Sequence, residues 1–132
     1  MIQEVKNPIR VLYIEDEKTL QDVISQMLQL LGYEVACAGN GKVGVEMAKD
    51  WKPDLILTDL RMPIMDGPEA IRTLRHDTDT THIPIFVLSA YTDSKTRETC
   101  RQAGADDFFT KPPDIEKIDA AIKKTVGKKP ER

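Results

Sequence analysis

The chain has 132 residues, which is the size of a single domain. Hydrophobic residues make up 40% of the chain and charged residues 31%, a composition that excludes a disordered segment. With only 7 Gly and 2 Cys, the chain is neither a collagen-like nor a disulfide-dense protein. The 19 Lys and Arg are outnumbered by 22 Asp and Glu, so the net charge is −3 and direct nucleic-acid binding is not expected.

Neither membrane insertion nor export is predicted. No segment contains the ~20 consecutive apolar residues that a membrane-spanning helix requires, and residues 1–10 lack the apolar run of a signal peptide. Cys37 and Cys100 lie far apart, without a CxxC pattern or a Cys/His cluster, so both are expected to be buried with free thiols. We therefore expect a cytoplasmic protein.

The first half of the chain alternates short apolar runs with helical periodicity. Two apolar runs predict buried strands at residues 11–14 and 55–58, and residues 34–38 are a further strand candidate that ends at a Gly39-Asn40-Gly41 turn. Between them, apolar side chains recur three and four residues apart, which is typical of helices that bury one face. The first helix is indicated by Leu20, Val23, Ile24, Met27, Leu28 and Leu31, with Gly32 after it, and the second by Val43, Met47 and Ala48, with Pro53 after it.

The second half continues this alternation, with strands predicted at residues 85–88 and 106–110. Pro68 begins a helix with apolar positions at Ala70, Ile71 and Leu74, and a polar loop follows over residues 76–83, in which His76 and His82 are expected to be solvated. Thr92 or Asp93 is expected to cap a helix that ends near Ala103, before Gly104. Asp114 is expected to cap a last helix with apolar positions at Ile115, Ile118, Ile122 and Val126.

This alternation predicts the fold class. Five strands alternating with five helices indicate a parallel sheet covered on both faces, because parallel strands need crossover helices. The chain contains no internal repeat and no stretch resembling a linker. We therefore expect one doubly wound α/β domain over residues 1–132, with a core at about 9–126 and a tail at 127–132.

Charged and hydroxyl side chains follow four of the five predicted strands. Glu15 and Asp16 follow the first strand, Asp59 the third, Ser89 the fourth and Lys111 the fifth. Ligands of doubly wound sheets bind outside the carboxyl ends of the strands, where the strand order reverses. Any one of these residues alone would more often be a turn, a helix cap or a solvated side chain. All five in these positions favour one shared pocket.

The chemistry of this predicted pocket is that of phosphoryl transfer. Three clustered carboxylates repel one another unless a cation is present, and their oxygens suit Mg²⁺. Ser89 and Lys111 could complete a pocket for a doubly charged anion. Carboxylates, Mg²⁺ and a Lys together form a phosphoryl-transfer site, in which an Asp can act as the nucleophile.

Four motifs resemble the two-component response-regulator receiver domain, the family that includes chemotaxis regulators. They are IEDE at residues 14–17, LTDLRMPIMDG at 57–67, LSAY at 88–91 and FFTKP at 108–112, and the similarity extends over residues 9–126. The resemblance implies a flavodoxin-like sheet with strand order 2-1-3-4-5. It also implies that the peptide bond between Lys111 and Pro112 is cis.

The resemblance assigns a role to each site residue. Asp59 would be the phosphoacceptor, and Ser89 and Lys111 would bind the phosphoryl oxygens. Mg²⁺ would be bound directly by Asp16, Asp59 and the backbone carbonyl of Arg61, and through a water molecule by Glu15. Ser89 and Phe108 would form the switch, and Arg61 and Tyr91 would tune hydrolysis. Phe108 lacks the hydroxyl of the Tyr found in many members, so its switch would depend on packing alone.

The implied function is signalling by phosphorylation, with no enzyme activity beyond the chain's own phosphorylation and dephosphorylation. A sensor histidine kinase or a phosphotransfer protein would donate the phosphoryl group from a phosphohistidine, and a small acyl phosphate could substitute. Phosphorylation would then change the face formed by the fourth helix, the fifth strand and the last helix, which would bind a downstream effector protein. Neither a nucleic acid nor a membrane is an expected partner.

Three alternatives use the same fold. A flavin- or phosphate-binding module is disfavoured because the predicted rim is rich in carboxylates. A Mg²⁺-dependent phosphatase would usually carry a second acid just after the nucleophile, whereas Arg61 lies two residues beyond Asp59. An unphosphorylated or degenerate receiver that serves as a protein-interaction scaffold is the remaining alternative, although all five site residues are present.

Overall fold

Five strands alternate with five helices along residues 7–127, which are the residues that the computed structural model describes. The strands are β1 (Arg10–Ile14), β2 (Glu34–Ala38), β3 (Leu55–Thr58), β4 (Ile85–Ser89) and β5 (Asp107–Thr110). The helices are α1 (Lys18–Leu30), α2 (Gly41–Trp51), α3 (Gly67–His76), α4 (Ser94–Ala103) and α5 (Ile115–Val126). Every element predicted from the sequence is present, and the predicted strand bounds differ by one residue at β1, β4 and β5.

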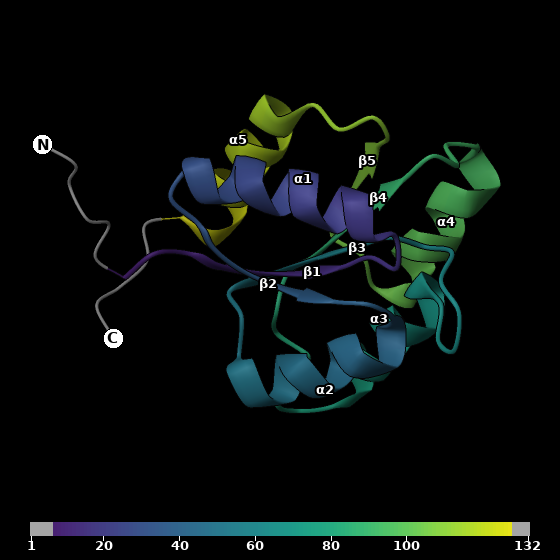
Figure 1. Cartoon of the computed structure of the whole chain (residues 1–132). Coiled ribbons are helices and arrows are strands. Elements are labelled where there is room, and N and C mark those ends of the chain that lie inside the picture. The colour runs from purple at the N-terminus through teal and green to yellow at the C-terminus, as the bar shows by residue number, and fades with distance from the viewer. Residues whose placement is uncertain (1–6, 128–132) are drawn as a thin grey trace, which may run out of the picture.

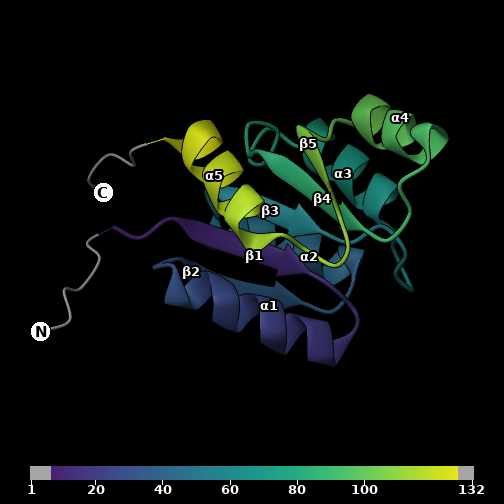
Figure 2. The same ribbon diagram turned by 90° about the horizontal axis from the view of Figure 1, so that it is seen from above.

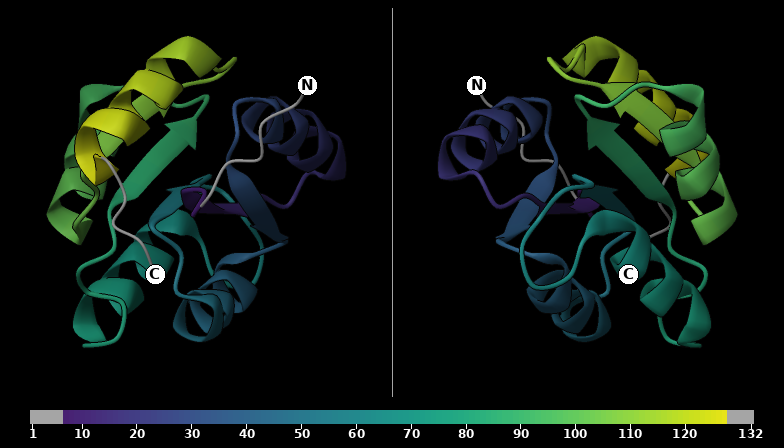
Figure 3. Two further views of the ribbon diagram at one scale, coloured as in Figure 1. Left: turned by 90° about the vertical axis from the view of Figure 1, so that its left-hand side faces the viewer. Right: turned by 90° about the vertical axis from the view of Figure 1, so that its right-hand side faces the viewer.

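The strands form one parallel sheet in the order β2-β1-β3-β4-β5. Helices α1 and α5 cover one face, and α2 and α3 cover the other (Figure 1). The two side views in Figure 3 show the sheet between these two layers. Seen from above in Figure 2, α4 lies near β5 and far from α1. The prediction of a doubly wound, flavodoxin-like sheet is therefore confirmed.

Two hydrophobic clusters, one on each face, hold the helices to the sheet. Alternation along β1 shows how they divide, because Leu12 and Ile14 pack with residues of α2 and α3, whereas Val11 and Tyr13 pack with residues of α1 and α5. All four of these side chains are fully buried. A strand buried on both faces explains the continuous apolar run that predicted β1.

Helix ends mostly follow the predicted capping residues. Asp93 caps α4 by accepting the N–H of Thr96, and Asp114 caps α5 by accepting the N–H groups of Glu116 and Lys117. Gly104 follows α4 in the left-handed region, with φ of 120°. Helix α4 buries only Cys100 and Ala103, so it is the helix with the smallest apolar contribution to the core.

A few sequence-based expectations need correction. Cys37 is only half-buried, because it lies on the edge strand β2, while Cys100 is buried as expected and both thiols are free. His76 ends α3, so the polar loop begins one residue later than predicted, although both histidines are exposed.

Gly127 follows α5 as its C-cap, and the rest of the expected tail, like residues 1–6, lies outside the described residues. No helix within residues 7–127 has both the length and the apolar character needed to span a bilayer.

Backbone hydrogen bonds extend three strand pairings one residue beyond the strands, at the edge where their carboxyl ends meet. The N–H of Glu15 donates to the carbonyl of Ala38, and the N–H of Asp59 donates to the carbonyl of Ile14, each at 2.9 Å. The N–H of Lys111 donates in the same way to the carbonyl of Ser89, at 2.9 Å. The first loop residue after each of these strands is therefore fixed by the sheet rather than by its loop.

Candidate functional site

Three carboxylates meet where the strand order reverses, between β1 and β3. Glu15, Asp16 and Asp59 each place a carboxylate oxygen within 4.8 Å of the others. Glu15 is 1% exposed, Asp59 is half-buried and Asp16 is exposed, so the cluster runs from the protein interior to the surface. Close carboxylate oxygens with one side open to solvent can hold a hard divalent cation.

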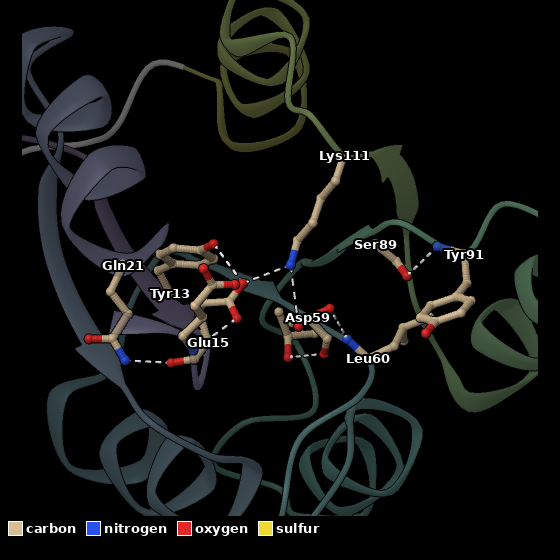
Figure 4. A network of polar contacts seen from close by, with 10 residues as sticks. Tyr13, Glu15, Gln21, Asp59, Leu60, Ser89, Tyr91 and Lys111 are labelled. Atoms are coloured by element: carbon tan, nitrogen blue, oxygen red, sulfur yellow. Dashed lines mark hydrogen bonds and ion pairs between the residues drawn. The ribbon is translucent and has the colours of Figure 1, made fainter. Parts of the chain in front are cut away.

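The Lys111 side chain enters this cluster from the end of β5 (Figure 4). Its Nζ lies 2.9 Å from Oε1 of Glu15 and 3.3 Å from Oδ2 of Asp59. Burial lowers the pKa of Lys111, but hydrogen bonds and the charges of Glu15 and Asp59 outweigh burial, so the pKa is raised above its ordinary value. Lys111 is therefore a stable cation shared by two carboxylates.

Asp59 is the carboxylate that both the sheet and the following loop hold in place. Its Oδ1 accepts the N–H of Leu60 at 2.7 Å, while its Oδ2 faces Lys111. The N–H of Gly67 donates to the carbonyl of Leu60 at 2.7 Å, which folds the β3–α3 loop back toward Asp59. A half-buried carboxylate with a cation beside it can act as a nucleophile.

Gly67 allows this close return of the loop. A Cβ added at Gly67 would lie 2.6 Å from the carbonyl oxygen of Asp59 and 2.8 Å from the Cα of Leu60. Both of these atoms belong to the backbone, so neither could move aside as a flexible side chain would. The absence of a side chain at Gly67 therefore helps to set the position of Asp59.

Glu15 is held by three hydrogen-bond donors. Its Oε1 accepts the Tyr13 hydroxyl at 3.0 Å in addition to Lys111, and its Oε2 accepts the N–H of Glu17 at 3.2 Å. Burial, followed by the charge of Glu15, raises the pKa of Tyr13 well above its ordinary value, so this hydroxyl remains protonated and donates. The sequence analysis assigned Tyr13 only to a buried strand. Tyr13 lies two residues before Glu15, however, and side chains two apart along a strand point to the same side, so its contact with Glu15 could have been predicted.

Ser89, Arg61 and Tyr91 lie on the β4 side of the carboxylates. Ser89 is fully buried, and its Oγ accepts the N–H of Tyr91 at 3.0 Å. The guanidinium carbon of Arg61 lies 3.9 Å from the centre of the Tyr91 ring, which is the geometry of a cation–π contact. The two expected hydrolysis-tuning side chains are therefore in direct contact with each other, which the sequence did not show.

Phe108, the expected switch aromatic, lies apart from the carboxylates. It is half-buried on β5, and the guanidinium carbon of Arg97 in α4 lies 4.9 Å from the centre of its ring. The expected cis peptide bond between Lys111 and Pro112 is confirmed. The structure thus brings Glu15, Asp16, Asp59 and Lys111 together, with Ser89 on the adjacent strand and Phe108 beside α4.

The chain is similar to known signalling proteins over most of its length. The family model of the response regulator receiver domain matches residues 11–123. Protein PilH of Pseudomonas aeruginosa is 34% identical over 109 residues, which cover 83% of this chain and 90% of PilH. Regulatory protein AtoC of Escherichia coli is 32% identical over 118 residues, which cover 89% of this chain but only 25% of AtoC. The chain likewise spans less than half the length of several other curated relatives that it matches.

A solved structure shows the same fold. It is the receiver domain of sensor histidine kinase PA1611 from Pseudomonas aeruginosa PAO1, described with a magnesium ion coordinated in its active site cleft. The two chains are 33% identical and superpose with a TM-score of 0.85, covering 92% of this chain and 99% of that one.

The close approach at Gly67 leads to a stability test. We expect Gly67→Ala to lower the free energy of unfolding by about 1–3 kcal/mol, because the new methyl group would displace the backbone at Asp59. Gly39→Ala is the matched control, since a Cβ there meets no atom within 4 Å and should change stability by less than about 0.5 kcal/mol. Urea denaturation of the two variants and the wild type measures the difference. Equal stabilities would contradict this account of Gly67.

Proposed function

Because the chain belongs to the family of response regulator receiver domains of two-component systems, we propose that Asp59 accepts the phosphoryl group and that residues 9–126 form the receiver unit. The main support for Asp59 as phosphoacceptor is the position of its carboxylate, which the sheet holds between the Lys111 ammonium and two further carboxylates. Asp59 is 13% exposed in its side chain, so a phosphodonor can reach it. Glu15, by contrast, is 1% exposed.

The proposed metal is Mg²⁺, which the donor set fits. Asp16 and Asp59 would bind it directly together with the backbone carbonyl of Arg61, and Glu15 would bind it through a water molecule. The magnesium ion in the related PA1611 receiver domain supports this assignment. When bound, Mg²⁺ supplies positive charge that stabilises the oxygens of the transferring phosphoryl group.

The proposed reaction begins with a phosphohistidine of a sensor kinase or a phosphotransfer protein. A carboxylate oxygen of Asp59 attacks phosphorus in line, so that an oxygen–phosphorus bond forms as the nitrogen–phosphorus bond breaks and the imidazole leaves with its electron pair. Lys111 neutralises charge on the phosphoryl oxygens, and the Ser89 hydroxyl donates to one of them. The chain would catalyse only this transfer and the later hydrolysis of its own phosphoryl group.

The proposed output is a change on the face formed by α4, β5 and α5. The phosphoryl group would draw Ser89 and Lys111 toward it, and the space vacated near Ser89 would admit the ring of Phe108. Helix α4 buries only two side chains, so moving it disrupts few apolar contacts. An effector protein would bind this face in its changed form.

Covalent labelling tests the phosphoacceptor directly. With Mg²⁺ and a small acyl phosphate, we expect intact mass spectrometry to show one added phosphoryl group that is stable in acid and lost in base. Asp59→Asn should abolish it, whereas Asp50→Asn, which changes an exposed carboxylate on α2, should not. Equal labelling of the wild type and Asp59→Asn would contradict the assignment of Asp59 as the phosphoacceptor. Labelling of neither protein would favour an unphosphorylated receiver that acts as a protein-interaction scaffold.

Thermal stability tests the metal ligands. We expect millimolar Mg²⁺ to raise the Tm, because a cation that binds only the folded state adds about 2.7 kcal/mol at 100 times its Kd. Asp16→Asn should lose this response and should raise the metal-free Tm, because one of three repelling charges is gone. Glu17→Gln, which changes the exposed neighbouring carboxylate, should keep the response. A full Mg²⁺ response in Asp16→Asn would show that this residue is not a ligand.

The lifetime of the phosphorylated state tests the contact between Arg61 and Tyr91. We expect Tyr91→Ala to speed loss of the phosphoryl group roughly tenfold, which corresponds to removing ~1.4 kcal/mol of the hydrolysis barrier. Because the two side chains form one stack, the double variant should be little faster than Tyr91→Ala alone. The measurement is a decay time course at fixed Mg²⁺ after removal of the donor. Identical rates in all variants would show that neither side chain shields the phosphoryl group.

A further inference from the structure

Tyr13 places a single hydroxyl at the boundary between the hydrophobic core and the acidic cluster. Its ring is fully buried in the cluster formed with α1 and α5. Its hydroxyl donates to Oε1 of Glu15 at 3.0 Å, as Figure 4 shows. A Phe at this position would fill the same space in the core, so the hydroxyl is the only part of Tyr13 that serves the site.

Glu15 depends on such donors because its side chain is 1% exposed and solvent cannot replace them. Its carboxylate also stands one methylene farther from the backbone than that of an Asp, which gives it an additional torsion to restrain. Two of its three donors are fixed by the fold, namely the Tyr13 hydroxyl on β1 and the N–H of Glu17. The third, Lys111, is shared with Asp59.

The two donors to Oε1 of Glu15, the Tyr13 hydroxyl and the Lys111 ammonium, therefore differ in whether they stay in place after phosphorylation. Under the proposed function, Lys111 follows the phosphoryl group on Asp59, and Oε1 of Glu15 then loses that contact. Tyr13 lies on β1, which is paired with a strand on each side, so its hydroxyl stays in place. Without it, Oε1 would be held by Lys111 alone and the carboxylate would lean toward the ammonium instead of toward the cation.

We propose that Tyr13 is a positioning residue that holds the Glu15 carboxylate in the orientation needed for divalent-cation binding. This inference rests on the proposed function, because it assumes that Glu15 contributes to the metal site. It differs from a purely structural role, in which the hydroxyl would only satisfy its own need for a hydrogen-bond partner in the core. A structural role would affect the stability of the fold without affecting the affinity for Mg²⁺.

The experiment compares two Tyr→Phe variants of the full chain. Tyr13→Phe and Tyr33→Phe each remove a hydroxyl that donates to a carboxylate, but the Tyr33 hydroxyl contacts Asp119 of α5 instead of a site residue. Isothermal titration calorimetry with MgCl₂ measures the Kd of the unphosphorylated protein. We expect the Kd to be about tenfold higher in Tyr13→Phe, at the low end of the effects seen when the support of a metal site is lost, because Glu15 acts through a metal-bound water, and unchanged in Tyr33→Phe.

A double-mutant cycle shows whether Tyr13 acts through Glu15. In a Glu15→Asp background the shorter carboxylate withdraws from the hydroxyl, so Tyr13→Phe should no longer change the Kd. An unchanged Kd in Tyr13→Phe, or the same tenfold effect in both backgrounds, would overturn the inference. A wild-type chain that binds no Mg²⁺ would overturn the proposed metal site itself and the inference with it. Normal Mg²⁺ binding without labelling of Asp59 would contradict only the proposed phosphoryl transfer.

Discussion

The Lys111 ammonium is the charge on which the acidic edge of the sheet depends. Near a protein surface, two like charges about 4 Å apart repel by about 4 kcal/mol. The three carboxylates place oxygens within 4.8 Å of one another, so their repulsion is of this order. Lys111 contacts two of the three, including the buried Glu15. The order β1-β3-β4-β5 makes this possible, because the carboxyl ends of β1 and β3 lie within reach of a Lys side chain that follows β5.

The same charge connects the chemistry to the rest of the fold. Lys111 is held at the end of β5 by the backbone bond to Ser89, and Phe108 lies three residues before it on the same strand. The ring of Phe108 contacts Arg97 of α4, a helix that buries only the two small side chains of Cys100 and Ala103. On the opposite side of the site, Tyr13 and Glu17 hold Glu15 without depending on Lys111. The site thus combines a carboxylate held by its own strand and loop with an ammonium that reaches it from β5.

The sequence predicted the fold and the residues at the site because both follow from local patterns. Apolar periodicity fixes the type of each element, and the rule that ligands bind at the carboxyl ends of parallel strands collects Asp16, Asp59 and Lys111. The contacts that remained hidden depend on side-chain direction in three dimensions. The stack of Arg61 on Tyr91 joins two loops, and spacing along the chain does not reveal it. The half-exposure of Cys37, by contrast, follows from the edge position of β2, which the expected strand order already implied.

The most direct test of the central claim is a crystal structure of the chain with Mg²⁺ and beryllofluoride, which mimics a phosphoryl group on a carboxylate. We expect beryllium to be bonded to Asp59, and Lys111 Nζ to have left Glu15 for a fluorine atom. The Tyr13 hydroxyl should remain within hydrogen-bond distance of Glu15. Beryllofluoride on another residue, or a Lys111 side chain that keeps its contact with Glu15 and reaches no fluorine atom, would contradict the claim that Lys111 is the mobile charge of a phosphoacceptor site centred on Asp59.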